Sequence, residues 1–168
     1  MGNMQLRLIV MRHAKAGELP GGPDAERALR ERGRHDATAA GRWLRDSGYI
    51  PAAAICSPAR RTRQTWQQVS AELGSAVPCS TDQRLYQADV GDLLEIIAAT
   101  PDEPATLLYI GHNPAAAELA AGLTGSGLDF PTSAIAVIAL PGPWAQIAPG
   151  TGELLASWTP RQGAGPGS

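Results

Sequence analysis

The sequence of 168 residues has little of what marks several large classes of protein. It contains two cysteines, Cys56 and Cys79, and neither a Cys-x-x-Cys pair nor a Cys/His spacing typical of zinc sites. The lack of a disulfide framework and of a secretory signal favours a reducing, cytoplasmic compartment. No apolar run approaches the ~20 residues of a membrane-spanning helix, so we expect no membrane partner.

The sequence also lacks a large excess of positive or negative charge, because the formal net charge is −2 and the isoelectric point is about 5.9. This balance argues against a nucleic-acid partner. The arginines are nevertheless clustered, in the stretches 27–34 and 60–63. Local positive patches on a mildly acidic protein are better suited to a small or localised anion than to a long polyanion.

Apolar runs of strand length alternate with segments of helical periodicity along most of the chain. We predict strands at 6–11, 52–56, 106–110, 134–140 and 152–159, a short one within 76–86, and helices near 34–46, 58–73, 89–99 and 115–123. This order predicts an α/β fold: a three-layer α/β/α sandwich with a mostly parallel central sheet and an antiparallel edge. We expect residues 1–161 to form one domain, and the Gly/Pro/Ser-rich segment 162–168 to be disordered.

The first strand is followed directly by Arg12 and His13. In open α/β sheets, ligands bind in the crevice at the carboxyl ends of the strands. Arg12 and His13 would place a fixed cation and a nitrogen nucleophile in that crevice, and the glycine- and proline-rich loop 14–26 would lie beside them. The alternative is a solvated strand-end charge beside a surface imidazole.

Two further strand ends carry polar residues. Ser57 after the second strand is a favoured N-cap, and Pro58 suits a first helical position, which places Arg60 in the first turn near the crevice. We interpret Arg61 and Arg63 as solvated.

His112 follows the third long strand, where Asn113 can cap a helix that Pro114 opens. Together, two imidazoles (His13, His112) and two guanidiniums (Arg12, Arg60) would form a pocket for a tetrahedral anion. Guanidiniums bind phosphate oxygens in a bidentate manner, and a neutral imidazole can attack phosphorus.

Three blocks in this order resemble the signature blocks of the histidine phosphatase superfamily: 8–14 (LIVMRHA), 57–65 (SPARRTRQT) and 111–114 (GHNP). The superfamily has a phosphoglycerate-mutase-like fold. Further segments, 30–34, 85–88 and 132–136, are similar to its phosphohistidine phosphatase branch, SixA.

The resemblance implies a role for each matching residue. His13 would be the nucleophile that becomes a phosphohistidine, and Arg12, Arg60 and His112 would bind the phosphoryl oxygens, with Ser57 and Asn113 as further substrate-binding residues. It implies no metal and no cofactor, and a partner that is a phosphorylated protein or a small phosphorylated molecule. His35 matches none of the blocks and is interpreted as a surface residue, and Cys56 as a small core residue.

One departure bears on the substrate. Ester-hydrolysing members of the superfamily typically have a glutamate general acid where this chain has Gln87. Asp89, Asp92 or Glu18 could substitute, and the sequence does not choose among them. We therefore expect phosphohistidine in proteins to be the substrate. The alternatives are a small-molecule phosphomonoesterase and a binding module that recognises a phosphorylated ligand without hydrolysing it.

Overall fold

Strand β1 (Gln5–Arg12) lies inside the sheet because both of its faces are apolar. Leu6 and Leu8 belong to one hydrophobic core, whereas Ile9 and Met11 belong to a second core on the opposite face. Side chains along a strand alternate between its faces, so β1 can be fully buried only between two layers of helices. It pairs with β4 on one side and with β5 on the other.

The computed structural model describes residues 5–160, whose six strands form one sheet in the order β3-β2-β4-β1-β5-β6. Strands β3, β2, β4 and β1 are parallel, whereas β5 runs antiparallel to β1 and to the edge strand β6. The other strands are β2 (Ala53–Cys56), β3 (Cys79–Thr81), β4 (Thr106–Gly111), β5 (Ile135–Pro141) and β6 (Glu153–Trp158). The helices are α1 (Glu31–Asp46), α2 (Arg60–Glu72), α3 (Val90–Ala98) and α4 (Ala115–Thr124), with short 3-10 turns η1 (Asp24–Glu26), η2 (Gln83–Gln87) and η3 (Trp144–Gln146).

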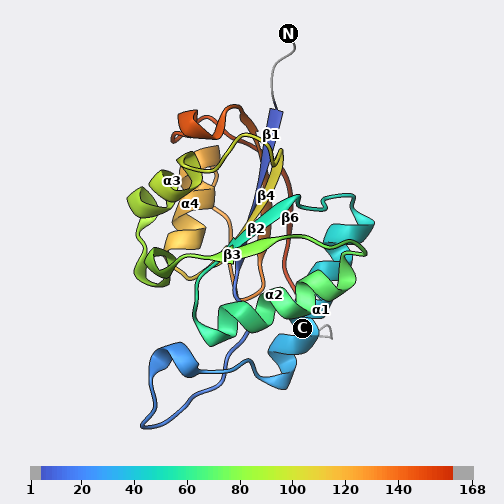
Figure 1. The fold of residues 1–168 in the computed structure, drawn as a ribbon, viewed down its shortest axis with the longest axis vertical. Helices are drawn as coiled ribbons and strands as arrows, with labels where there is room; N and C mark the ends of the chain where they lie inside the picture. The colour runs from blue at the N-terminus through green and yellow to red at the C-terminus, as the bar shows by residue number, and fades with distance from the viewer. Residues whose placement is uncertain (1–4, 161–168) are drawn as a thin grey trace.

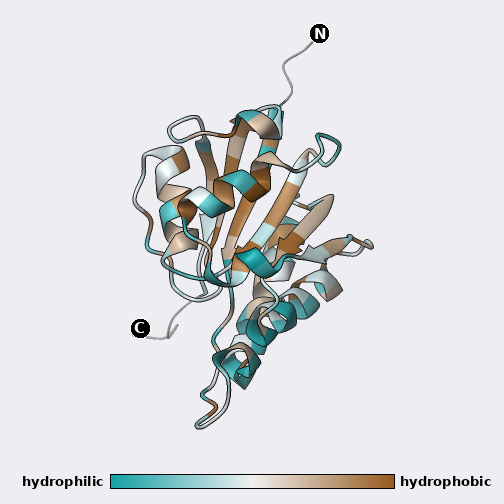
Figure 2. Ribbon diagram, turned by 60° about the vertical axis from the view of Figure 1, so that its left-hand side comes forward, coloured by the Kyte–Doolittle hydropathy of each residue, from teal (hydrophilic) through white to brown (hydrophobic). Residues whose placement is uncertain are grey.

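The helices cover the sheet in two pairs, as expected for a three-layer sandwich. Helices α3 and α4 contribute to the same core as Leu6, and α1 and α2 to the same core as Ile9. Figure 1 shows the first pair to the left of the sheet and the second pair at the lower right. In Figure 2 the strands are mostly hydrophobic, whereas much of the helical surface is hydrophilic. The predicted α/β class, layers and antiparallel edge are thus confirmed.

The predicted start of α2 is wrong. Ser57 does not cap the helix and Pro58 does not begin it, because the helix starts at Arg60. The Ser57 hydroxyl is completely buried and accepts a hydrogen bond from the backbone N–H of Ala59, at 3.2 Å. Three residues (57–59) therefore separate β2 from α2, and this later start changes which arginine faces the sheet edge.

The start of α4 differs from the prediction by one residue, because Pro114 precedes the helix instead of opening it. Asn113 still satisfies a backbone donor of the first turn, since its Oδ1 accepts from the N–H of Ala117 at 3.2 Å. Its amide Nδ2 donates to the carbonyl of Phe130 at 2.9 Å. The side chain thus joins the start of α4 to the segment that enters β5.

The parallel register brings three strand ends to one edge of the sheet. Arg12 of β1 lies opposite Gly111 of β4, and Cys56 of β2 lies opposite Ile110. The residue that follows each strand therefore emerges at the same edge, and the backbone N–H of His13 donates to the carbonyl of Gly111 at 2.9 Å. This is the crevice predicted from the sequence.

None of the helices within residues 5–160 is long and apolar enough to cross a membrane. The segment 162–168, predicted to be disordered, lies outside the described residues.

Helices α1 and α2 pack tightly at Gly41. A Cβ atom there would lie 2.7 Å from the carbonyl oxygen of Val69 and 3.0 Å from the Cβ of Glu72. We predict that Gly41→Ala lowers the free energy of unfolding by about 1–2 kcal/mol, because overpacking outweighs the gain in helix propensity. Urea-induced unfolding measures the difference.

Gly122→Ala is the matched control, because a Cβ atom at this exposed position of α4 has no neighbour within 4 Å. We expect this variant to be more stable by about 0.4–1 kcal/mol. Equal stability changes in the two variants would contradict the tight contact between α1 and α2.

Candidate functional site

His13 follows β1 directly and lies at the bottom of the crevice, with only 8% of its surface exposed. Its Nδ1 is 2.8 Å from the carbonyl oxygen of Ala14. A carbonyl can only accept, so Nδ1 carries the proton and Nε2 keeps its lone pair. Burial lowers the pKa of His13 to about 3, which leaves the ring neutral at pH 7. His13 is thus an imidazole with a free nucleophilic nitrogen.

The position of His13 is fixed from the helix side of the sheet. The backbone N–H of Ala14 donates to the Thr65 hydroxyl at 2.9 Å, and that hydroxyl donates to the carbonyl of Arg61 at 2.7 Å. Thr65 is completely buried. Helix α2 therefore holds the strand end that carries the nucleophilic nitrogen.

His112 follows β4, and its ring centroid lies 5.2 Å from that of His13. Its Nε2 is 2.8 Å from the Ser57 hydroxyl, and its Nδ1 is 3.5 Å from a terminal nitrogen of Arg61. A guanidinium can only donate, so this contact favours the tautomer in which Nε2 donates to Ser57. Burial and the charge of Arg61 lower the pKa of His112 to about 4. Both imidazoles of the crevice are consequently neutral at pH 7 before a ligand binds.

Arg12 contributes a cation at the end of β1. A terminal nitrogen donates to the carbonyl of Phe130 at 3.3 Å, whereas the buried Nε has no partner among the described residues. Burial lowers the pKa of Arg12, but a guanidinium remains charged at neutral pH. Its charge is therefore only partly compensated by the protein.

The structure corrects the assignment of the second arginine. Arg60 is exposed and does not line the pocket, whereas Arg61, predicted to be solvated, is 5% exposed and does line it. Residues 61, 62, 65 and 69 form the buried face of α2, and residue 60 lies about 100° away around the helix. Because α2 begins two residues later than predicted, this face could not be assigned from the sequence.

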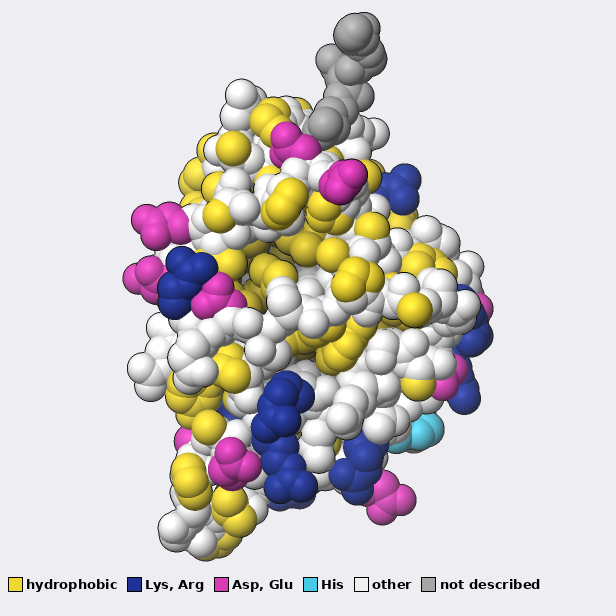
Figure 3. Space-filling view, in the orientation of Figure 1, with side chains coloured by type: hydrophobic (Ala, Val, Ile, Leu, Met, Phe, Trp, Pro, Cys, Tyr) yellow, Lys and Arg dark blue, Asp and Glu magenta, His cyan; other side chains and the backbone are white. Residues whose placement is uncertain are grey.

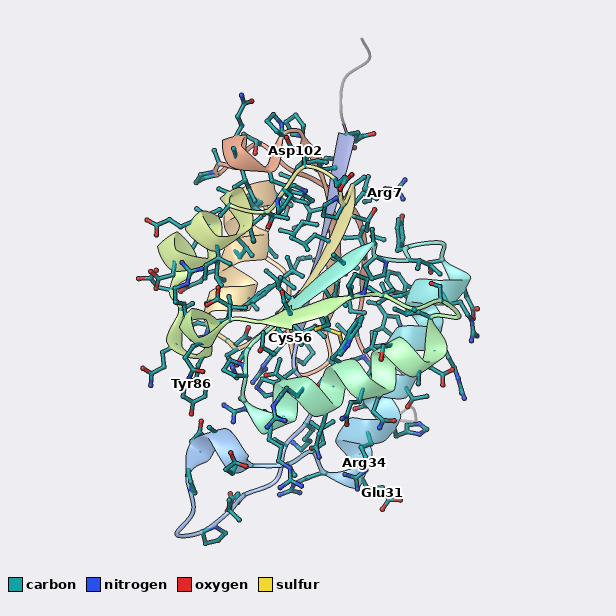
Figure 4. All side chains as sticks on the ribbon, viewed as in Figure 1. Arg7, Glu31, Arg34, Cys56, Tyr86 and Asp102 are labelled. Carbon is teal, nitrogen blue, oxygen red and sulfur yellow. The ribbon has the colours of Figure 1, made fainter. Side chains whose placement is uncertain are left out.

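Arg61 is held by a carboxylate that the sequence analysis did not single out. Its two terminal nitrogens donate to Asp24, one to the backbone carbonyl at 2.9 Å and one to Oδ2 at 3.0 Å. The Tyr86 hydroxyl also donates to Oδ2, at 2.5 Å, and Arg27 donates to Oδ1 at 2.9 Å. Figure 4 shows Tyr86 directed from η2 toward the segment that carries η1. These contacts hold the pKa of Asp24 well below its usual range, and the hydrogen bond from Tyr86 has the largest effect. The carboxylate is therefore ionised.

These side chains surround a pocket of about 460 Å³. It is lined by Arg12, His13, Lys15, Ala16, Asp24, Arg27, Arg61, Tyr86, Gln87, His112, Asn113 and Thr132. The loop 14–26 borders the pocket as predicted and supplies Lys15 and Asp24, and Arg27, which follows the loop, also lines the pocket. Figure 3 shows Lys and Arg side chains gathered below the centre of the molecule, around the lower end of the fold. Four cations against one carboxylate make the pocket attractive to an anion.

None of the carboxyl groups considered from the sequence as proton donors lines the pocket. Gln87 lines the pocket, but Asp89, Asp92 and Glu18 do not. Asp89 and Asp92 instead accept each other's backbone N–H groups in a capping box at the start of α3. Among the described residues that line the pocket, Asp24 is the only carboxylic side chain, and its lowered pKa makes it unsuited to donate a proton.

Of the two further residues predicted to bind substrate, one lines the pocket and the other contacts a residue that lines it. Asn113 lines the pocket, whereas Ser57 lies behind it and holds His112. His35 is exposed and Cys56 is 1% exposed, so both interpretations are confirmed. Within residues 5–160, no group of three or more His, Cys, Asp or Glu side chains is placed to hold a metal ion.

The two adjacent arginines allow a matched test of the pocket. We predict that Arg61→Ala weakens the binding of tungstate, a tetrahedral oxyanion, by about 10- to 100-fold, as expected when hydrogen bonds to a charged ligand are lost. Arg60→Ala removes the same charge from an exposed position and should change the affinity less than about threefold. Titration calorimetry measures both; a larger loss in Arg60→Ala than in Arg61→Ala would contradict the observed orientation of α2.

Comparisons with known proteins agree with this geometry. Residues 8–124 match the model of the histidine phosphatase superfamily, branch 1. The uncharacterised protein Rv1276c of Mycobacterium tuberculosis is 39% identical, over 90% of this chain and all of its own length.

Two solved structures resemble the fold closely. The candidate phosphohistidine phosphatase SixA of Nakamurella multipartitia is 32% identical, with a TM-score of 0.81 over 93% of this chain and 96% of its own. A protein histidine phosphatase SixA complexed with tungstate is 26% identical, with a TM-score of 0.79 over 92% of this chain and 97% of its own. This chain therefore belongs to the histidine phosphatase superfamily, and within it to the SixA branch.

Proposed function

We propose that this chain is a phosphatase that hydrolyses phosphohistidine in a protein, through a phosphorylated His13. The observation that carries the proposal is the state of His13. Its ring is neutral, its Nδ1 proton is engaged by Ala14, and its Nε2 lone pair is free in a pocket rich in cations. The similarity to proteins described as SixA phosphohistidine phosphatases supports the choice of substrate.

In the first step, Nε2 of His13 attacks the phosphorus of the substrate. A P–N bond to His13 forms as the P–N bond to the substrate ring breaks, and the bonding electrons go to the ring nitrogen of the substrate. Arg12 and Arg61 donate to the phosphoryl oxygens. His112 lies beside His13 and can donate to the same group once the bound anion has favoured protonation of its second ring nitrogen. Because the two arginines are already in place, they stabilise the transition state without first being reorganised.

In the second step, water attacks the phosphorylated His13. An O–P bond forms, the P–N bond to His13 breaks, and one proton of the water passes to the phosphate product. Nε2 recovers its lone pair, and the Nδ1 bond to Ala14 keeps the same tautomer for the next cycle. The reaction thus uses His13 as a nucleophile and as a leaving group in turn.

The shortage of a proton donor favours a nitrogen-linked substrate. An alkoxide is a poor leaving group, whereas a phosphohistidine ring that is protonated on its other nitrogen leaves as neutral imidazole. Gln87 cannot supply a proton as a carboxylic acid does, and Asp24 is kept ionised by Tyr86, Arg27 and Arg61. An enzyme without a general acid should therefore act better on phosphohistidine than on alkyl phosphates.

The direct test is to trap the intermediate. We predict that rapid quench with a labelled phosphohistidine peptide yields a phosphorylated protein whose label is stable to base and labile to acid. His13→Ala should lose both the label and the release of phosphate, while still binding tungstate because the two arginines remain.

The outcomes separate the alternatives. Turnover that survives in His13→Ala would refute the proposed nucleophile. Binding of the peptide by the unmodified protein, without release of phosphate, would identify a binding module. Faster cleavage of alkyl phosphates than of the peptide would identify a phosphomonoesterase with another acid in place.

A second prediction concerns Gln87. Replacing it with glutamate places a carboxyl group at the pocket, and general acid catalysis typically contributes about 10²- to 10⁴-fold. We expect Gln87→Glu to raise kcat/KM for an alkyl phosphate by at least about tenfold, with a smaller change for the phosphohistidine peptide. Gln87→Asn is the control for any change in the size of the side chain. Equal gains on both substrates would show that the leaving group does not limit the reaction.

A further inference from the structure

The two cysteines of the chain meet in the structure although 23 positions separate them. Cys56 ends β2 and Cys79 begins β3, and their sulfur atoms lie 3.2 Å apart without a disulfide bond. Figure 4 shows Cys56 in the middle of the molecule, beside β3. This contact has no part in the reaction proposed above.

The pairing of the strands explains the contact. Ala54 lies opposite Cys79 in the parallel register, so Cys56, two positions further along β2, presents its side chain on the same face as Cys79. A disulfide bond is about 2.05 Å long, so the sulfurs would have to approach by roughly 1 Å. Strand β3 has three exposed residues and pairs only with β2, which makes it the partner able to shift.

The two thiols differ in the way that a redox pair requires. Cys79 is exposed, whereas Cys56 is 1% exposed. The hydrogen-bond contact between the two sulfurs lowers the pKa of Cys79 and raises the pKa of Cys56, which burial raises further. Cys79 is therefore the accessible thiol that ionises first, and Cys56 is a protected thiol within reach of it.

We propose that Cys56 and Cys79 form a redox site, which a peroxide converts reversibly into a disulfide. The Cys79 thiolate attacks one oxygen of hydrogen peroxide, the O–O bond breaks, and a sulfenic acid and one water form. The Cys56 sulfur then attacks the Cys79 sulfur, the S–O bond breaks, and a second water leaves. Overall, two thiols are oxidised to one disulfide while one peroxide is reduced to two waters.

The cysteine pair is connected along the chain to two parts of the pocket, so its oxidation should reach the bound anion. Cys56 precedes Ser57, whose hydroxyl holds His112 at 2.8 Å. From Cys79 the chain runs through β3 into η2, which carries Tyr86 and Gln87 at the pocket. Drawing the two sulfurs together would shift β3 against β2, and with it η2 relative to Ser57. This consequence rests on the proposed function, in which the pocket binds a tetrahedral oxyanion.

The first experiment tests the disulfide without reference to activity. Reduced protein is treated with hydrogen peroxide, and its free thiols are counted before the peptides are mapped by mass spectrometry. We expect free thiols to fall from two to none per chain, with a linked peptide pair that dithiothreitol separates. In Cys56→Ala, the same treatment should leave a sulfenic acid on Cys79 that dimedone traps. Free thiols that persist, or the absence of a linked pair, would overturn the proposal.

The second experiment tests the coupling. We expect the oxidised protein to bind tungstate about tenfold more weakly, the loss that follows from one displaced hydrogen bond to a charged ligand, and dithiothreitol to restore the affinity. Cys79→Ser changes an exposed side chain and should bind equally well with and without peroxide. A disulfide that leaves the affinity unchanged would refute the coupling. If the reduced protein failed to bind tungstate at all, the proposed function would fail, and the peptide map would still decide the redox site.

Discussion

The burial of β1 on both faces is the constraint on which the rest of the structure depends. A strand with Leu8 on one side and Ile9 on the other must lie between two helix layers, and it therefore takes an inner place in the sheet. His13, the residue that follows, then emerges at the middle of the sheet edge, between the ends of its neighbours. The hydrophobic effect along six residues thus positions the imidazole, and the hydrogen bonds to Ala14 and from the Ala14 N–H to Thr65 orient it.

Electrostatics sets the state of the site that this position creates. Cations and burial act in the same direction on His13 and His112, because each disfavours a positive charge on the ring. The cost of gathering Arg12, Arg27 and Arg61 near one another is reduced by the carboxylate of Asp24, which is ionised for the same reason. The result is a pocket that is positively charged and yet keeps its imidazoles neutral, which is the state that a nitrogen nucleophile needs.

The same arrangement of charge limits the chemistry. A carboxylate paired with two arginines and a tyrosine is a poor acid, so the contacts that hold Arg61 in the pocket also remove Asp24 as a proton donor. The other carboxyl groups considered from the sequence are committed elsewhere or lie away from the pocket, as at the capping box of α3. An enzyme without a proton donor depends on the leaving group being good already, and this is the basis for proposing nitrogen-linked phosphate, not an alkyl ester, as the substrate.

The sequence by itself determined the features that depend on interactions between neighbouring residues. Apolar runs and helical periodicity were enough for the α/β sandwich, and the parallel order of strands placed Arg12, His13 and His112 at one edge. Three signature blocks in order were enough for the family. These features follow from periodicity, strand ends and residue type, each of which is visible within a few neighbouring positions.

Only the tertiary structure decided the rest. Whether Arg60 or Arg61 faces the pocket depends on where α2 begins, and that follows from the burial of Ser57 against His112. Asp24 and Tyr86 meet across 62 positions because the loop after β1 lies against η2. Cys56 and Cys79 meet across 23 positions because β3 pairs with β2. Such contacts arise from the packing of distant segments, for which no short stretch of sequence carries a signal.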